Sequence, residues 1–213
     1  MQKILFISFV LISLSSLFST ASKTFNIDQA QLNKIENKFG TQGKNRVEEW
    51  DSMMESSKDE TILNKIKNVN DFFNQITYQS DSIHWKKHDY WATPFEFMGS
   101  GAGDCEDYAI AKYFSLIKLG IPDEKLRITY VTYRRSNSSY EEAHMVLTYY
   151  HRVGVEPVVL DNINKTLQIA SSRPDLKPVY SFNASGLWQA KTKGESRVGD
   201  NNLKSWKDLM ERF

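Results

Sequence analysis

A chain of 213 residues with a formal net charge of +1 has no overall field that would favour nucleic acid or an anionic membrane surface. Aromatic residues make up 13% of the chain, which predicts a well-packed globular body. The single cysteine excludes an intrachain disulfide, so the fold must be stable without covalent cross-links.

The first 21 residues have the pattern of a secretory signal peptide. One lysine lies near the start, an apolar run extends from Ile4 to Phe18, and the small residues Ser19-Thr20-Ala21 follow. A membrane anchor is the alternative, but the apolar run is rich in serine and shorter than the ~20 residues that a spanning helix needs. We therefore expect residues 1–21 to be removed on export, leaving one soluble domain over residues 22–213.

Amphipathic helices are expected at the beginning of this domain. Residues 25–43 predict a short helix that ends at Gly40 and Gly43. Between residues 45 and 76 the apolar positions recur at steps of three and four, and the polar stretch 55–61 divides them into two helices. These helices are predicted to serve packing, since they carry no residues with an evident chemical role.

The region 77–103 has no clear period and is interpreted as an ordered loop. The next stretch, Cys105 to Leu119, is the clearest helix in the chain, because its apolar residues fall on one face. Gly120 ends it and Pro122 follows.

A period of two then predicts strands, which are separated by polar loops. The expected strands cover residues 126–133, 144–150, 155–160 and 179–182. A closing helix is predicted over residues 203–213. Helices followed by a cysteine-bearing helix and then an antiparallel sheet define an α+β fold.

Cys105 lies where a reactive thiol would be expected. It follows Gly101-Ala-Gly-Asp104 and begins the predicted helix, whose N-terminus carries about half a positive charge and favours a thiolate. The glycines allow a substrate backbone to approach closely and leave N–H groups free to stabilise an oxyanion. A lone cysteine can also be a small buried apolar residue, but such a residue more often lies further along the apolar face of a helix. The position favours the reactive thiol.

A thiolate nucleophile needs a base and the base needs an orienting partner. Among the four histidines, His84, His88 and His151 are expected at the surface, whereas His144 opens an apolar strand. Asp161 closes the next strand and could lie beside His144 across an antiparallel sheet. A buried His–Asp pair with a purely structural role would give the same sequence.

Three carboxylates, those of Asp104, Glu106 and Asp107, lie within two positions of Cys105. Without neutralisation they would raise the pKa of the thiol and oppose the thiolate. Helix capping is the simple interpretation of these acids. A bound cation is the alternative, and carboxylate oxygens suit Ca²⁺ better than zinc.

Several motifs together resemble the bacterial transglutaminase-like cysteine proteinases over about residues 64–188. The motifs are Trp91-Ala-Thr-Pro-Phe-Glu96, Gly101-Ala-Gly-Asp-Cys-Glu-Asp-Tyr-Ala109, His144-Met-Val-Leu147, Val159-Leu-Asp-Asn162, Arg173-Pro-Asp-Leu176, Tyr180-Ser-Phe-Asn183 and Gly186-Leu-Trp188. The resemblance implies a papain-like fold with N-terminal helices and a nucleophile-bearing helix packed on an antiparallel sheet. It further implies the catalytic triad Cys105, His144 and Asp161, and it makes Asp104, Glu106 and Asp107 calcium ligands.

The same resemblance implies a biological role. Members of the family are calcium-dependent periplasmic proteases that cut a large surface adhesin at a paired-alanine site near its N-terminus. Cleavage releases the adhesin and disperses the biofilm, and a cyclic-di-GMP receptor of the LapD kind holds the protease inactive. Two other functions stay open: a transglutaminase-type acyltransferase with the same triad, and a non-catalytic calcium-binding interaction module. Isopeptide formation with a lysine donor would identify the acyltransferase.

Overall fold

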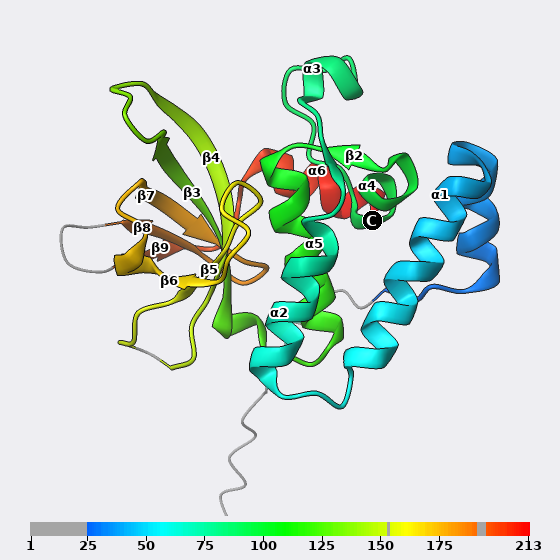
Figure 1. The fold of residues 1–213 in the computed structure, drawn as a ribbon, viewed down its shortest axis with the longest axis horizontal. Helices are drawn as coiled ribbons and strands as arrows, with labels where there is room; N and C mark the ends of the chain where they lie inside the picture. Colours follow the sequence, from blue (N-terminus) through cyan, green and yellow to red (C-terminus); the bar gives the residue numbers. More distant parts are fainter. Residues whose placement is uncertain (1–24, 153, 191–194) are drawn as a thin grey trace, which may run out of the picture.

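The helices and the main sheet pack as two layers in the computed structural model, which describes residues 25–152, 154–190 and 195–213 (Figure 1). The predicted signal peptide lies outside these residues. The helices are α1 (Gln29–Ser57), α2 (Ile62–Phe73), α3 (Asp81–His84), α4 (Pro94–Ser100), α5 (Cys105–Lys118) and α6 (Lys204–Arg212), with 3-10 turns at Asp123–Lys125 and Ala170–Ser172. Within the described ranges, no helix is long and apolar enough to cross a membrane.

The main sheet has seven antiparallel strands in the order β6-β5-β4-β3-β7-β8-β9. Its strands are β3 (Leu126–Arg134), β4 (Glu141–Tyr149), β5 (Val158–Leu160), β6 (Gln168–Ile169), β7 (Leu176–Phe182), β8 (Leu187–Ala190) and β9 (Glu195–Gly199). This architecture confirms the predicted α+β fold, with a cysteine-bearing helix on an antiparallel sheet. Three strands, β6, β8 and β9, were not predicted. The strand β6 has only two residues, and the sequences of β8 (LWQA) and β9 (ESRVG) do not alternate between apolar and polar residues.

The α1 helix corrects the predicted helix end near residue 43. The chain does break at Gly40, whose φ of 75° and ψ of 177° are not helical, but the helix resumes and runs to Ser57. Gly43 lies inside it, where an added Cβ would be 2.6 Å from the carbonyl oxygen of Gly99. Gly43 therefore permits the close approach of α1 to α4 and does not end a helix.

Region 77–103 is not the loop that the sequence indicated. The strands β1 (Thr77–Tyr78) and β2 (Ala102–Gly103) form a parallel pair, and α4 lies between them in the chain. The start of α4 is a capping box: the Thr93 hydroxyl accepts from the Glu96 N–H, and the Glu96 carboxylate accepts from the Thr93 N–H. Pro94 occupies the first turn. These signals are present in the sequence but precede a helix too short to show a period.

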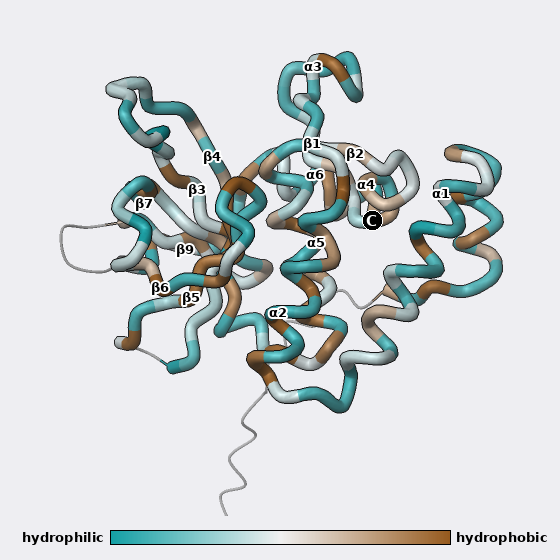
Figure 2. The backbone as a smooth tube through the Cα atoms, viewed as in Figure 1, coloured by the Kyte–Doolittle hydropathy of each residue, from teal (hydrophilic) through white to brown (hydrophobic). Residues whose placement is uncertain are grey.

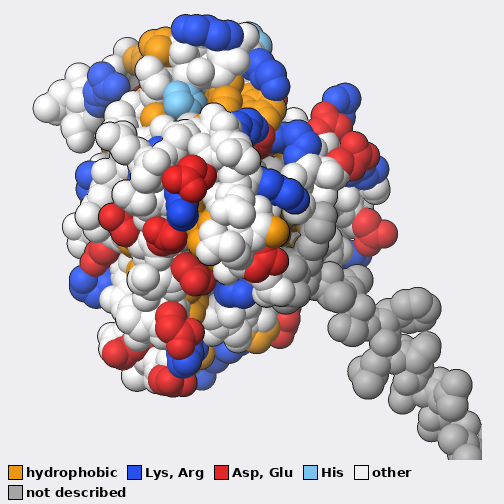
Figure 3. All heavy atoms as spheres, turned by 90° about the vertical axis from the view of Figure 1, so that its right-hand side faces the viewer, with side chains coloured by type: hydrophobic (Ala, Val, Ile, Leu, Met, Phe, Trp, Pro, Cys, Tyr) orange, Lys and Arg blue, Asp and Glu red, His pale blue; other side chains and the backbone are white. Residues whose placement is uncertain are grey.

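The core lies between α5 and its neighbours in both layers. Trp50 of α1, Phe73 of α2 and Phe114 of α5 are at most 2% exposed, and Phe182 of β7 is fully buried. In Figure 2, hydrophilic residues predominate along α1, at the edge of the helical layer. Figure 3 shows acidic and basic side chains interspersed over that side of the molecule, in keeping with the small net charge. The buried α5 thus holds its first turn, with Cys105, at a fixed position against the sheet.

Candidate active site

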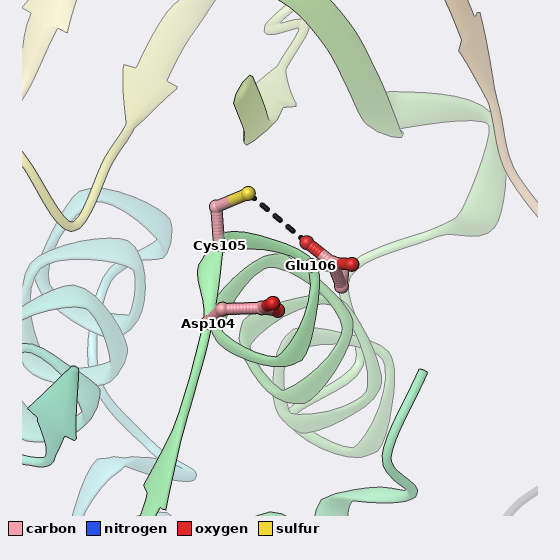
Figure 4. A group of neighbouring side chains, drawn as sticks. All are labelled: Asp104, Cys105 and Glu106. Atoms are coloured by element: carbon pink, nitrogen blue, oxygen red, sulfur yellow. Dashed lines mark hydrogen bonds between the residues drawn. The ribbon is translucent and has the colours of Figure 1, made fainter. Parts of the chain in front are cut away.

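Cys105 is the first residue of α5 and is partly exposed. The strand β2 leads directly into it, and an added Cβ at Gly103 would lie 2.3 Å from a carboxylate oxygen of Asp107. Figure 4 shows the Cys105 and Glu106 side chains turned toward each other at the first turn of the helix, where the thiol donates to Glu106 Oε2 over 3.0 Å. The thiol therefore has an acidic neighbour that competes for its proton.

The surroundings of Cys105 oppose ionisation of the thiol. Desolvation at the sulfur is the largest cause that raises its pKa well above the usual value, and the carboxylates of Glu106 and Asp104 add to it. A hydrogen bond from the backbone of Met145 acts in the opposite direction and lowers this pKa. Because Met145 follows His144 in β4, this contact also brings the sulfur next to the strand that carries His144.

His144 and Asp161 form a buried pair on the sheet. His144 Nε2 lies 2.8 Å from Asp161 Oδ1, and the two residues are 4% and 1% exposed. The antiparallel register explains the contact, since β4 and β5 pair Leu147 with Leu160 and Asp161 follows directly. With Nε2 engaged by the carboxylate, Nδ1 is the ring nitrogen that remains for a thiol.

Arg173 is a member of this site to which sequence reasoning assigned no role. Its Nη2 donates to Asp161 Oδ2 over 2.7 Å, and its guanidinium also binds Asp175. The Ile163 N–H donates to Asp161 Oδ1 over 2.9 Å. Burial alone would raise the pKa of Asp161, but His144, Ile163 and Arg173 together lower it well below its usual range. Arg173 lies in a matched motif, but only the folded chain shows that the motif reaches Asp161.

The other histidines have different surroundings. His88 and His151 are exposed, as expected. His84 is less exposed than predicted, and its Nδ1 lies 2.9 Å from Gln79 Oε1. Only His144 is joined to a carboxylate among the histidines, all of which lie in the described ranges.

Five carboxylates gather at the start of α5, and they include two that the sequence analysis did not single out. Ligand atoms of Asp81, Asp104 and Asp107 lie within 4.8 Å of one another, and so do those of Asp81, Asp89 and Glu106. Asp81 and Asp89 belong to the segment around α3, more than ten residues before Cys105, so only tertiary folding reveals them. Burial is the largest cause that raises the pKa of Asp81 to about 6 and that of Asp104 to about 10.

This cluster suits a hard cation. Asp81 Oδ1 and Asp104 Oδ1 are buried and have no hydrogen-bond partner in the part of the chain that the structure describes. Asp107 differs, because its two oxygens accept from the N–H groups of Ala92 and Asp104, at 2.8 and 3.3 Å. Unpartnered carboxylate oxygens that repel one another are the donor set expected for calcium.

A family model described as bacterial transglutaminase-like cysteine proteinase matches residues 37–211. The chain belongs to this family of cysteine proteinases. Among curated proteins, none matches the chain.

Solved structures of LapG from Legionella pneumophila are similar to the chain. An EGTA-treated form is 42% identical with a TM-score of 0.75, and the match covers 87% of this chain and 97% of that one. A calcium-bound form is also 42% identical, with a TM-score of 0.73 and coverage of 87% and 99%. A third LapG structure is 40% identical, with a TM-score of 0.75 and coverage of 89% and 97%.

Proposed function

We propose that this protein is a calcium-dependent cysteine endopeptidase in which Cys105, His144 and Asp161 form the catalytic triad. The observation that carries the proposal is the buried His144–Asp161 pair, held on the strand whose Met145 backbone hydrogen-bonds the thiol. Membership of a cysteine proteinase family that matches most of the chain supports it, and Cys105 is the only cysteine available.

The geometry suits acyl transfer to water. His144 Nδ1 takes the proton of the Cys105 thiol, and the sulfur attacks the peptide carbonyl carbon. Backbone N–H groups at the start of α5, including that of Cys105, stabilise the oxyanion. The C–N bond breaks, the amine leaves with the proton from His144, and a thioester remains. Water, deprotonated by His144, then hydrolyses the thioester and restores the thiol.

Asp161 and Arg173 act through His144. Asp161 accepts from Nε2, which fixes the tautomer and stabilises the imidazolium that forms when the thiol is deprotonated. Arg173 holds the second oxygen of Asp161 and so keeps the carboxylate ionised and oriented.

The acidic cluster would hold calcium through Asp81, Asp104, Glu106 and neighbouring carboxylates, and one similar LapG structure is calcium-bound. The bound ion supplies positive charge that offsets the carboxylates beside the nucleophile. Engagement of Glu106 in such a site would remove the acceptor that now competes for the thiol proton at 3.0 Å. The thiol would then be free to pair with His144.

Membership of the family supports a proposal for the biological setting. We infer that the protein acts in the periplasm after removal of residues 1–21, and that its substrate is the N-terminal region of a large adhesin with a paired-alanine site. Release of that adhesin would disperse a biofilm. A cyclic-di-GMP receptor of the LapD kind would regulate the protease through its periplasmic domain.

Cleavage of a purified adhesin N-terminal fragment tests this function. The fragment is incubated with the protein in a chelator, after calcium is restored, and with Cys105→Ala as the control. Cleavage that needs calcium and Cys105 would support both the triad and the metal. Cleavage that is unchanged by the chelator would indicate that the carboxylates beside Cys105 serve helix capping and bind no catalytic metal. Formation of an isopeptide product with an added lysine donor would favour an acyltransferase.

A further inference from the structure

Lys112 is a buried ammonium group that the proposed mechanism does not use. It lies in α5 and is 1% exposed. Its Nζ donates to Asn70 Oδ1 over 3.0 Å, to Asn74 Oδ1 over 2.8 Å and to the backbone carbonyl of Asp161 over 3.2 Å. Three oxygens therefore match the three protons of the ammonium group.

Asn74 reaches the same carbonyl from another element. It follows the last residue of α2, and its Nδ2 donates to the Asp161 carbonyl oxygen over 2.9 Å. Lys165 closes the network, since its Nζ donates to the Asn74 carbonyl oxygen over 2.7 Å. The backbone of Asp161 is thus tied to both α2 and α5, while its carboxylate points to His144.

The network joins the two halves of the site. Lys112 lies seven positions after Cys105, which is two turns further along nearly the same face of α5. The nucleophile and the lysine therefore belong to one rigid, buried helix, whereas Asp161 and His144 belong to the sheet. A bond from Lys112 to the Asp161 backbone fixes the sheet half relative to the helix that carries the nucleophile.

A purely packing role does not account for an ammonium at this position. Burial, the largest cause, lowers the pKa of Lys112 to about 7, whereas the Asp161 carboxylate raises it. An apolar residue of similar length would fill the space without that desolvation cost. What it could not do is donate to the Asp161 carbonyl.

We propose that Lys112, together with Asn74, is a positioning residue that holds Asp161, and through it His144, at the correct separation from Cys105. The proposal rests on the catalytic triad proposed above. It predicts that loss of the lysine donor lowers kcat and leaves KM nearly unchanged, because the reacting groups are misplaced while the substrate-binding surface is intact.

The test compares Lys112→Met with Lys118→Met in calcium-saturated protein. Lys118 lies on the same helix and also donates to a backbone carbonyl, that of Phe25 over 2.8 Å, but away from the site. We expect Lys112→Met to lower kcat about 10- to 100-fold and Lys118→Met to leave it unchanged. Asn74→Ala removes a donor to the same carbonyl and one acceptor of Lys112, without a substitution in α5. This variant serves as the test if Lys112→Met does not fold.

The Asp161→Ala background, in which residue 161 has no side chain to orient His144, separates positioning from general loss of stability. If Lys112 acts through the Asp161 side chain, Lys112→Met should lower kcat no further in that background. An equal further loss, or a normal kcat in both Lys112→Met and Asn74→Ala, would overturn the proposal.

The iodoacetamide reaction rate of the only cysteine, at one fixed pH, gives a readout that needs no substrate. We expect Lys112→Met to slow alkylation and Lys118→Met not to do so. If the wild-type protein cleaves no adhesin but alkylation still responds in this way, the substrate assignment fails while the positioning role stands. If wild-type cleavage is normal and neither kcat nor alkylation responds to Lys112→Met and Asn74→Ala, the positioning role fails alone.

Discussion

The two halves of the site differ in how completely their carboxylates are hydrogen-bonded. On the sheet, Asp161 has partners for both oxygens in His144, Ile163 and Arg173. On the helical side, carboxylates face one another, and Asp104 keeps an unpartnered buried oxygen among the described residues. The sheet half is therefore organised by protein groups alone, whereas the helical half has the electrostatics of a site completed by a cation.

Removal of the proposed nucleophile or of its proposed base gives the largest expected effect. Cys105→Ala should abolish proteolysis, and His144→Ala should lower kcat by about 10⁴-fold or more, because the thiol then lacks a proton acceptor. Initial rates on the adhesin fragment measure both, with circular dichroism to verify folding.

The other histidines are the matched controls. His84→Ala, His88→Ala and His151→Ala should retain cleavage, since none of the three is paired with a carboxylate in the described structure. Loss of activity in one of these three variants would show that His144 had been wrongly assigned as the base.

Loss of carboxylates should break the helical half and spare the sheet half. Asp104→Ala together with Glu106→Ala should weaken calcium binding and lower activity, because two oxygen donors beside Cys105 disappear. Titration calorimetry with calcium measures the first effect and adhesin cleavage the second. Unchanged calcium affinity would exclude these two residues as ligands.

Asp81→Asn extends this test to a residue that the sequence did not indicate. It should also weaken calcium binding, because the Asp81 carboxylate lies close to two sets of acidic side chains. One set is Asp104 and Asp107, and the other is Asp89 and Glu106. An exposed carboxylate of α1, changed in Glu48→Gln, serves as the control.

Loss of Arg173 should damage the sheet half without touching calcium. Arg173→Met leaves Asp161 buried with one oxygen unpaired, and breaking such a buried pair costs about 3 kcal/mol of unfolding free energy. Activity should fall as the Asp161–His144 geometry loosens. Denaturant unfolding and calcium calorimetry would check this, and a lost calcium affinity would mean that the two halves are not independent.

The features that could be predicted from the sequence depend on local contacts, and those that could not depend on long-range contacts. The helix that begins at Cys105 and the strands around His144 and Asp161 were predictable, because period and helix-end signals are local. The approach of Asp81 to the first turn of α5 was not, since a segment without a period places it there. Arg173 was likewise out of reach, because its partner Asp161 is defined by sheet register and loop path.

The α4 capping box is visible in the sequence, but region 77–103 was nevertheless interpreted as a loop. Thr93-Pro94 followed by Glu96 is the pattern of a helix N-terminus, but the helix has only seven residues, too few to show a periodic apolar face. Gly43 shows the opposite case: a glycine that reads as a helix end serves close packing against Gly99. Short elements and close contacts depend on tertiary structure, and a single sequence leaves them undetermined.

The smallest expected effect concerns pH. The contributions of Asp81 in the helical half and of Asp161 in the sheet half to the unfolding free energy should change with pH in opposite directions. In chelated protein, the pKa of Asp81 is raised to about 6, so between about pH 4 and 6 the folded state binds more protons than the unfolded state. Its contribution to the unfolding free energy therefore falls as pH rises, by about 2 kcal/mol. Asp161 has a lowered pKa, so its contribution is complete above about pH 4 and is lost as pH falls further.

Denaturant unfolding from pH 3 to 7 distinguishes the two contributions. Asp81→Asn should reduce the loss of stability that chelated protein shows between about pH 4 and 6, whereas Asp104 and Asp107, whose pKa values burial also raises, continue to contribute to it. Saturating calcium should also reduce this loss in the wild type, because the ion binds the ionised carboxylates. Asp161→Asn should instead reduce the loss below pH 4. If Asp81→Asn reduced the slope above pH 4 and calcium left the contribution of Asp81 unchanged, Asp81 would be a buried acid outside the metal site.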